Sequence, residues 1–337
     1  MIECGSQCLL CNLPIRFDTY RGCTHGCEYC FVKRKNDSLA TVTKDGSPEQ
    51  LKAFIDGKRN AYTEWCDWDI PLHWGGMSDP FQPCELRYRV SYECLKIFAE
   101  TKYPFVVSTK GRLAATDEYL ELIKECNCVF QISAVSPLFN RIEKGCPTYE
   151  ERIKMAEKIA PHVKRLIIRI QPYMPDVFKS VCENIPKLRD AGVYGVVLEG
   201  MKYTKRVNPS LEKLLGDYVY SLKVLEPQFK YIKELCHQNG LAFFSGENRL
   251  RLLGDSTTCC GCEGLEGFEV NKFNLVHIHN NIPVAPTRRM KEAGTAKCFC
   301  GVNQDTVSTH FFAEHSFSEV MNWFGKKDAF KKALTKR

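Results

Sequence analysis

The stretch RGCTHGCEYCF, residues 21–31, places three thiols within eight residues, at Cys23, Cys27 and Cys30. It follows a short predicted strand, IRFDTY at 15–20, so the thiols are expected in the loop at the carboxyl end of that strand. An odd number of neighbouring cysteines cannot all pair as disulfides. The 337-residue chain has 19 cysteines, too many to explain by packing alone, and some of them are expected to bind metal.

The composition is that of an ordinary soluble globular protein, with 44% hydrophobic and 26% charged residues. The first residues, MIECGSQCLLCNLPIRF, have neither the basic flank nor the apolar core of a signal peptide. No stretch approaches the roughly 20 apolar residues that span a bilayer. We therefore expect a cytoplasmic protein without a membrane partner, in a compartment where thiols stay reduced. The net charge of +7 permits an anionic substrate without requiring one.

Short apolar runs alternate with helical patterns along the first 250 residues. The expected strands are rich in β-branched and aromatic residues, as strands buried on both faces are, and lie at 15–20, 70–75, 104–109, 128–133, 165–171 and 193–200, with 241–246 as a candidate seventh. This alternation predicts an α/β fold with parallel strands and right-handed crossovers, a partial (β/α)6 TIM-like barrel. Ligands of such folds bind at the carboxyl ends of the strands.

Four helices are predicted between these strands. Residues 84–100 place Leu86, Val90, Cys94 and Ile97 on one stripe of a continuous helix. A helix over 116–126 begins at Thr116, and Thr148 with Glu151 forms a capping-box pattern. The helix over 177–192 ends at Gly192.

The alternation stops near residue 250. We divide the chain into an N-terminal cysteine-containing segment (1–13), the partial barrel (14–250) and a cysteine-rich C-terminal extension with a basic helical tail (251–337). The tail carries six lysines and arginines between 326 and 337, which suit nucleic-acid phosphates or simply a solvated helix end.

The spacing Cys-x3-Cys-x2-Cys suits three irons of a [4Fe–4S] cluster, which leaves the fourth iron free to bind a cofactor. A structural zinc site instead uses four closed ligands, usually as two separated pairs. Gly22 and Gly26 let the backbone wrap closely around a cluster.

The motif GCTHGCEYCF resembles the signature of the radical S-adenosylmethionine (radical SAM) superfamily, including Tyr29 before the last cysteine. The resemblance implies a [4Fe–4S] cluster held by Cys23, Cys27 and Cys30, with S-adenosylmethionine on its open iron. It also implies reductive cleavage of that cofactor to a 5′-deoxyadenosyl radical, which abstracts hydrogen from a substrate. An electron donor such as flavodoxin or ferredoxin is implied as a partner.

The segments HWGGMSDPF, FVVSTKG and EKGCPTYEERI are similar to those of the spore photoproduct lyase-like branch. This likeness, over roughly residues 14–200, implies cofactor contacts for Tyr29, for the backbone of Gly75 and Gly76, and for Ser78, Lys110 and Ser133. Spore photoproduct lyase has a hydrogen-donating cysteine beside the Ser-Asp of the first segment. The stretch HWGGMSDP has no such cysteine, and Cys84, a few residues on, is the candidate substitute, so the DNA-repair activity is not carried over.

A second metal site is expected from the C-terminal cysteines, with zinc or an iron–sulfur cluster as its occupant; the candidates are Cys259, Cys260, Cys262, Cys298 and Cys300. The N-terminal thiols Cys4, Cys8 and Cys11 repeat the spacing of the motif, as ligands of another metal centre or as packing residues. The scattered cysteines are interpreted mostly as small buried apolar residues; they are Cys66, Cys94, Cys126, Cys128, Cys146, Cys182 and Cys236.

His277 and His279 are expected on one polar face of a strand, and Arg169 and Gln171 at a strand end that lines the pocket. The favoured function is a radical SAM enzyme acting on a nucleotide or nucleic acid. Two alternatives stay open: an enzyme that modifies a peptide or protein, and a non-catalytic zinc-binding interaction module.

Overall fold

The structure is a computed structural model that describes residues 2–4, 11–32, 42–60, 63–64, 66–214, 217–272, 274, 276–277, 280 and 282. Its centre is an eight-stranded sheet of order β1-β2-β5-β6-β7-β8-β9-β13. The parallel members are β2 (Ile15–Phe17), β5 (Leu72–Trp74), β6 (Phe105–Thr109), β7 (Cys128–Ser133), β8 (Arg165–Tyr173), β9 (Gly195–Gly200) and β13 (Ala242–Ser245). The edge strand β1 (Ile2–Cys4) runs antiparallel to β2.

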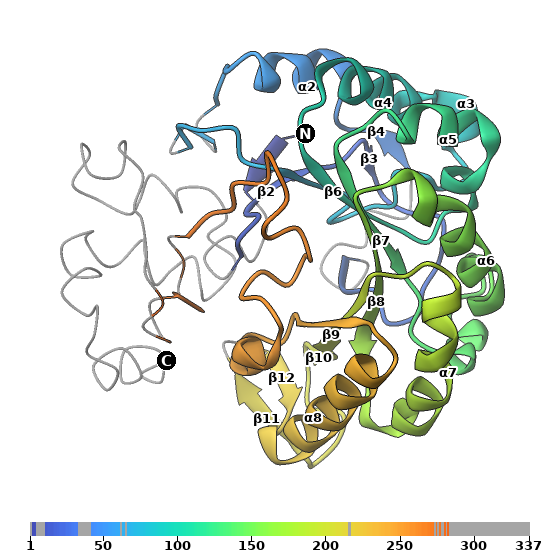
Figure 1. Ribbon diagram of the computed structural model, residues 1–337, viewed down its shortest axis with the longest axis vertical. Helices are drawn as coiled ribbons and strands as arrows, with labels where there is room; N and C mark the ends of the chain where they lie inside the picture. Colours follow the sequence, from blue (N-terminus) through green and yellow to red (C-terminus); the bar gives the residue numbers. More distant parts are fainter. Residues whose placement is uncertain are drawn as a thin grey trace.

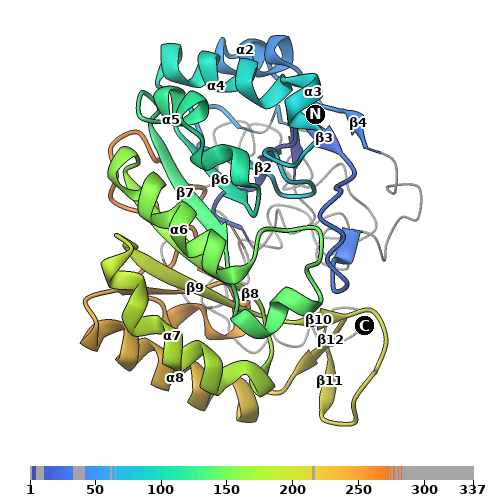
Figure 2. The ribbon, with the colours of Figure 1, turned by 90° about the vertical axis from the view of Figure 1, so that its right-hand side faces the viewer.

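The α-helices lie along the outside of this curved sheet (Figure 1). They are α2 (Pro48–Ile55), α3 (Glu85–Tyr88), α4 (Val90–Thr101), α5 (Asp117–Ile123), α6 (Tyr149–Ile159), α7 (Phe178–Asp190) and α8 (Leu222–Gln238). Figure 2 shows α4 to α8 following one another around the sheet. The expected partial TIM-like barrel of parallel strands is therefore confirmed, with β13 as its seventh parallel strand.

Both faces of the sheet are buried, as the nearly continuous apolar strands predict. Phe105, Val107 and Phe130 point outward into the main core, which packs against the helices. The alternate residues point inward and form a second apolar cluster. Its members are Leu13, Val106, Val129, Ile167, Val197, Phe244, Cys260, Cys262 and Phe268. Residues from beyond 255 therefore cover the inner side of the sheet (Figure 1, orange trace).

One helix prediction is wrong, because residues 84–100 form two helices rather than one. Arg89, at φ +55, interrupts the helix and separates α3 from α4. The buried carboxylate of Glu85 accepts hydrogen bonds from the backbone N–H groups of Ser91 and Tyr92, so it satisfies the free amino end of α4. As a result Leu86 is 65% exposed and leaves the predicted apolar stripe.

The other helix signals largely hold. Thr148 and Glu151 form the capping box of α6, and Gly192 takes φ +72 just after α7. Thr116 occupies the cap position of α5, but its hydroxyl donates to the Leu113 carbonyl instead of capping the helix.

Several short elements were not predicted. They are the β3–β4 pair (Tyr20–Arg21, Thr43–Lys44), the small sheet of β10 (Lys202–Tyr203), β11 (Leu211–Leu214) and β12 (Asp217–Tyr220), and the 3₁₀ turns η3 (Arg112–Ala115), η4 (Pro137–Arg141), η5 (Ala160–His162), η6 (Pro175–Val177) and η7 (Asn248–Leu253). Such short segments carry too few residues for a periodic pattern. The edge strand β1 and the helices α2 and α8 were not predicted either.

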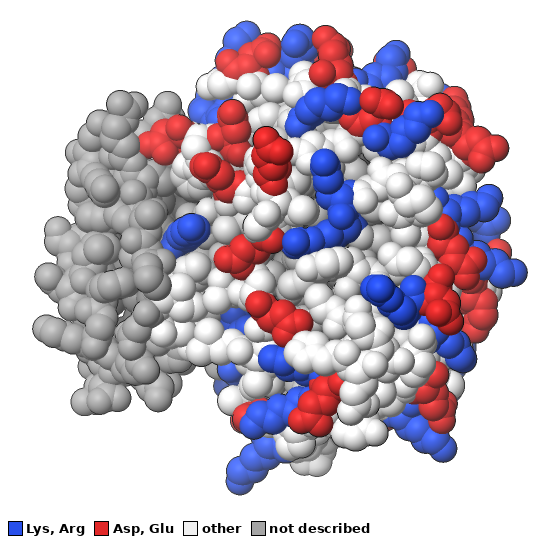
Figure 3. All heavy atoms as spheres, viewed as in Figure 1, with Lys and Arg blue, Asp and Glu red and all other residues white. Residues whose placement is uncertain are grey.

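His277 lies in a helical turn rather than in the expected strand, with its Nε2 atom 3.1 Å from Nδ2 of Asn12. His279 and the basic tail lie outside the described residues. No helix in the described part of the chain combines the length and apolar character needed to cross a bilayer. On the face in Figure 3, basic and acidic side chains are interleaved, as the modest net charge predicts.

Candidate active site

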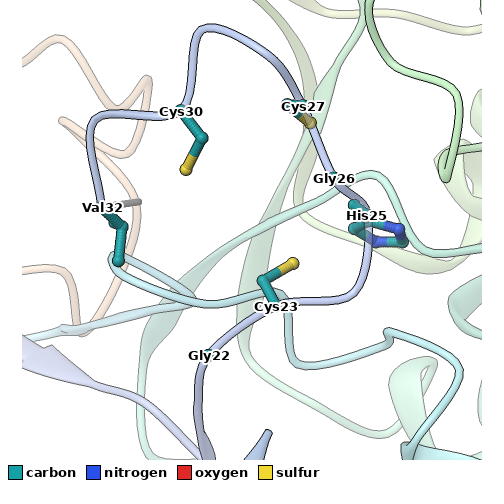
Figure 4. A pocket seen from close by; sticks show the side chains of 7 residues that line it. All are labelled: Gly22, Cys23, His25, Gly26, Cys27, Cys30 and Val32. Atoms are coloured by element: carbon teal, nitrogen blue, oxygen red, sulfur yellow. The ribbon is translucent and has the colours of Figure 1, made fainter. Parts of the chain in front are cut away.

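The three thiols of the opening motif lie around one hollow. Residues 22–30, here called the upper loop, follow β2 and β3 at the carboxyl end of the parallel strands. Cys23, Cys27 and Cys30 line one hollow together with Gly22, His25, Gly26 and Val32 (Figure 4). Gly22 and Gly26 adopt φ +86 and +67, which other residues rarely take, so glycine is what lets the loop curl.

The first half of the upper loop is held by hydrogen bonds from two other segments of the chain. The side chain of Gln82, fully buried, accepts from the Thr24 N–H at 3.0 Å and donates to the Gly22 carbonyl at 3.0 Å. Further along, the Gly145 N–H donates to the His25 carbonyl at 3.1 Å. A Cβ on Gly145 would lie 2.5 Å from that carbonyl oxygen, so the close contact requires glycine.

A buried ion pair links the upper loop to the next two strands. Nε2 of His25 lies 3.1 Å from Oδ2 of Asp79. Asp79 also accepts from the Thr109 hydroxyl at 2.7 Å and from the Lys110 N–H at 2.6 Å. Burial disfavours the charge on both partners, but their attraction outweighs it. The pKa of His25 is therefore raised and that of Asp79 lowered.

Glu143 is the centre of a second buried network. Its carboxylate pairs with the Arg152 guanidinium, and both side chains are fully buried. It also accepts a hydrogen bond from the Tyr29 hydroxyl and lies 3.9 Å from Nζ of Lys110. Arg152 in turn donates to the Ser133 carbonyl at 2.7 Å. Glu143 thus joins Tyr29, Lys110 and the end of β7 into one unit.

Cys146 is a site neighbour that sequence reasoning missed. Its sulfur lies 3.6 Å from that of Cys27, so it is more than the small packing residue that the sequence indicated. The hydrogen bond between them lowers the pKa of Cys27, although burial opposes this, and raises the pKa of Cys146. The segment GCP at 145–147 follows no strand or helix signal, which is why its position could not be inferred.

The six residues expected to contact the cofactor lie at or just beyond the carboxyl ends of β2 and β5 to β7. Gly75 adopts φ +85, and a Cβ there would lie 2.5 Å from the Ser108 carbonyl oxygen. Ser78 donates its hydroxyl hydrogen to the Tyr20 carbonyl at 2.6 Å. Lys110 lies with Nζ 5.7 Å from the centre of the Tyr29 ring. Their roles toward the cofactor stay predictions, as do those of Gly76 and Ser133.

Below the carboxyl ends of the strands, the inner face of the sheet carries a layer of polar side chains, here called the polar layer. Its members are His73, Ser108, Gln131, Arg169, Gln171 and Glu199. Ser108 lies 3.1 Å from His73 Nε2 and donates to Gln131 at 2.9 Å. Arg169 donates to Gln131 at 2.7 Å, and Gln171 donates to Glu199 at 2.8 Å. Arg169 and Gln171, which were expected to line the pocket at a strand end, both belong to this network. His73 and Glu199 were missed, because each is a single polar residue in an apolar run.

Burial of His73, aided by the charges of Arg169 and Arg16, lowers its pKa to about 3. The imidazole is therefore neutral at pH 7. It can donate or accept a hydrogen bond inside the barrel without adding positive charge.

The C-terminal cysteines are only partly described. Cys259, Cys260 and Cys262 lie on the inner side of the sheet, and Cys11 from the N-terminal segment packs against the same cluster. Cys298, Cys300 and Cys8 lie outside the described residues, as does the side chain of Cys4. Among the described side chains, no three Cys, His, Asp or Glu are close enough to hold a single metal ion.

Comparisons with known proteins identify the fold. No family model matches the chain. Uncharacterized proteins of Mycobacterium tuberculosis and Mycobacterium bovis are each 26% identical to it over 211 residues, which cover 56% of the chain and 59% of theirs. The matched part therefore spans about three-fifths of the length of these relatives.

Two solved structures of spore photoproduct lyase share the fold. One, complexed with a dinucleoside spore photoproduct, has a TM-score of 0.57 and 16% identity over 73% of this chain and 78% of its own. The other, a variant with bound AdoMet and the same dinucleoside, has a TM-score of 0.56 and 16% identity over 69% of this chain and 76% of its own. The expected likeness to the spore photoproduct lyase-like branch is thus confirmed for the fold.

Proposed function

We propose that the chain is a radical SAM enzyme whose upper loop binds a [4Fe–4S] cluster through Cys23, Cys27 and Cys30. The observation that carries this proposal is the convergence of the three thiols on one hollow at the carboxyl ends of the parallel strands. When bound, such a cluster supplies the electron that cleaves S-adenosylmethionine to methionine and a 5′-deoxyadenosyl radical.

The donor set and its surroundings fit this cluster. Three thiols line the hollow, and the ring nitrogens of His25, which also lines it, face Asp79 and the Gly145 carbonyl. Gly22 and Gly26, with positive φ, let the loop curl around the hollow. Lys110, buried near Cys27, offsets part of the negative charge that three thiolates bring. Its ammonium group also suits the carboxylate of a bound amino acid cofactor.

The residues around the hollow have three tasks in this proposal. Gln82, Asp79 and Gly145 keep the upper loop in a fixed curve. Glu143 holds Lys110 and Tyr29 in place. The apolar cores on both sides of the sheet exclude water from the barrel, which protects a reactive carbon radical from quenching.

For the substrate we propose a nucleotide or nucleic acid. The fold likeness to a lyase bound to a dinucleoside and the net charge of +7 support this choice. The polar layer faces the barrel interior below the upper loop, where its amide, guanidinium and carboxylate groups suit a polar substrate. A cytoplasmic location and a flavodoxin or ferredoxin as electron donor belong to the same proposal.

The test of the reaction class is anaerobic reconstitution with iron and sulfide, then addition of dithionite and S-adenosylmethionine. We expect 5′-deoxyadenosine to form with the native chain and to disappear with Cys27→Ala. Cys182→Ala, which changes a thiol on α7, is the matched control and should keep the product. Product formation by Cys27→Ala would overturn the site assignment.

The substrate class has its own test. Binding of single-stranded oligonucleotides should weaken steadily as salt rises, because phosphate contacts release counterions. A chain that does not bind oligonucleotides but chemically modifies a peptide would instead support the protein-modifying alternative. A colourless chain with bound zinc would support the interaction module.

A further inference from the structure

Four thiols from opposite ends of the chain meet inside the barrel. Cys259, Cys260 and Cys262 lie in residues 258–262, here called the lower turn, and Cys11 packs against them from the segment before β2. The spacing along the chain instead groups Cys11 with Cys4 and Cys8. The four thiols that meet in the barrel are packed with Val106, Val129 and Ile167, near the amino ends of β6, β7 and β8. This position is at the opposite end of the strands from the upper loop.

The lower turn is fixed to the sheet by specific contacts. Gln131 donates to the Cys260 carbonyl at 3.2 Å, and Arg165 donates to the Gly261 carbonyl at 2.8 Å. Gly261 adopts φ +68, and a Cβ there would lie 2.8 Å from Cδ1 of Ile167. The turn therefore needs glycine at this point both for its backbone conformation and for its contact with β8. Three cysteines are held in a tight curve by these contacts.

A buried cation accompanies the four thiols. Arg251 is 3% exposed, and it donates to the Thr257 carbonyl and to the Asn248 side chain. Its Nε group has no hydrogen-bond partner among the described residues. The charge of its guanidinium group acts on Cys259, Cys11 and Cys260. A buried guanidinium with an unused N–H favours a nearby anion, and the charges of Cys259, Cys11 and Cys260 act on Arg251 more strongly than that of Glu199.

Ordinary roles do not account for this arrangement. The sulfurs of Cys259 and Cys260 are 3.9 Å apart, well beyond the roughly 2.05 Å of a disulfide bond. A tetrahedral zinc site with Zn–S bonds of about 2.3 Å brings all its thiolates to about 3.8 Å from one another. Cys259 and Cys260 have this spacing, but among the described residues no group of three such ligands could hold a single metal ion. An iron–sulfur cluster spreads its thiolates over several irons, so it suits a wider set.

From these observations we propose that Cys11, Cys259, Cys260 and Cys262 bind a second iron–sulfur cluster at the amino-terminal end of the barrel. The cluster joins the segment before β2 to the segment after η7, and Arg251 supplies the compensating positive charge. It is separate from the cluster proposed for the upper loop and does not depend on it.

The test begins with a chain that lacks the upper site. A Cys23→Ala/Cys27→Ala/Cys30→Ala variant is reconstituted anaerobically with iron and sulfide, and its iron, sulfide and Mössbauer spectrum are measured. We expect about half the iron of the native chain to remain, on the order of 4 per chain for a cubane. Adding Cys11→Ala or Cys262→Ala to this variant should remove at least three-quarters of what remains. Cys182→Ala, added instead, should leave it unchanged.

The outcomes separate the two proposals. Loss of all iron in the triple variant, with native circular dichroism, overturns the second cluster. One equivalent of zinc without iron in the triple variant also overturns the second cluster. Retained iron that survives both Cys11→Ala and Cys262→Ala overturns the ligand assignment. Failure to form 5′-deoxyadenosine in the native chain would overturn the proposed function but would leave the iron count of the triple variant as the measure of this site.

Discussion

The upper loop and the lower turn both present three closely spaced cysteines, yet their surroundings differ. The upper loop is held by polar and ionic groups, namely Gln82, the His25–Asp79 pair and the Glu143–Arg152 pair. The lower turn is covered mainly by apolar side chains of the sheet, among them Val106 and Ile167. The first surrounds a hollow, whereas in the second Cys260 and Cys262 are buried. The difference indicates that the upper loop leaves its ligand accessible, whereas the lower turn encloses its ligand.

Removing Arg152 should have the largest effect of the substitutions considered, and it should act on the upper loop alone. Arg152→Ala leaves the Glu143 carboxylate buried without its cation, which costs about 3–5 kcal/mol. We expect a matching fall in the free energy of unfolding in urea. The Arg152→Ala/Glu143→Gln double variant should recover part of this loss. A single variant as stable as the native chain would contradict the role of the pair.

The packing of the lower turn can be tested at Gly261, with Gly264, just beyond the turn and also at positive φ, as the control. Gly261→Ala meets both the backbone penalty and the Ile167 side chain, so it should cost about 2–4 kcal/mol. Gly264, at φ +79, has no atom within 4 Å of its Cβ position, so Gly264→Ala should cost only about 1 kcal/mol. Thermal denaturation of both variants measures the difference. Equal losses would mean that the turn isn't packed on β8.

A pair of buried glutamines sharpens the comparison further. Gln82→Ala removes the hydrogen bonds to Thr24 and Gly22, and Gln131→Ala removes the one to Cys260. Each should cost about 1–3 kcal/mol, because partners are left unsatisfied.

The two glutamine variants should differ in iron binding. Gln82→Ala should weaken retention of iron at the upper loop, and Gln131→Ala should leave that iron in place. Iron analysis after gel filtration checks this. The reverse pattern would mean that the contacts of these glutamines do not govern the two sites.

At pH 7 the smallest expected effect is that of protonation in the polar layer between the two regions. The pKa of His73 is about 3 in the folded chain and about 6.5 when unfolded, so only the unfolded chain takes up a proton between these values. Stability from this group is fully present above pH 6.5 and falls as the pH drops toward 3, by at most about 1.4 kcal/mol per pH unit. His73→Gln should flatten this slope in urea titrations. An unchanged slope would show that His73 is not held neutral.

The sequence predicted the barrel well because its strands are continuous apolar runs. All seven expected strand regions contain parallel strands, and the capping box at Thr148 was read correctly. The break at Arg89 could not be predicted, because it depends on the Glu85 carboxylate meeting residues of other elements. Local spacing also revealed the upper thiols, whose ligands are neighbours along the chain.

Long-range contacts could not be predicted in this way. The approach of Cys146 to Cys27 joins positions 119 residues apart, and no local pattern marks it. The same holds for Cys11, whose spacing linked it to the nearby Cys4 and Cys8 and not to the lower turn. Spacing along the chain identifies ligands that are close in sequence, whereas tertiary folding decides the others.

The packing of Cys11 and Cys259 against one apolar cluster also sets an order of assembly during synthesis. Every described contact that shapes the upper loop lies before residue 153, so this region is complete once the first half of the chain has emerged. The lower turn cannot form before residue 262 has been synthesised. At about 5–20 residues per second, those 110 further residues (262 minus 152) take roughly 5–20 s. A nascent chain thus passes through an interval in which Cys11 and the inner face of the sheet are open to the solvent.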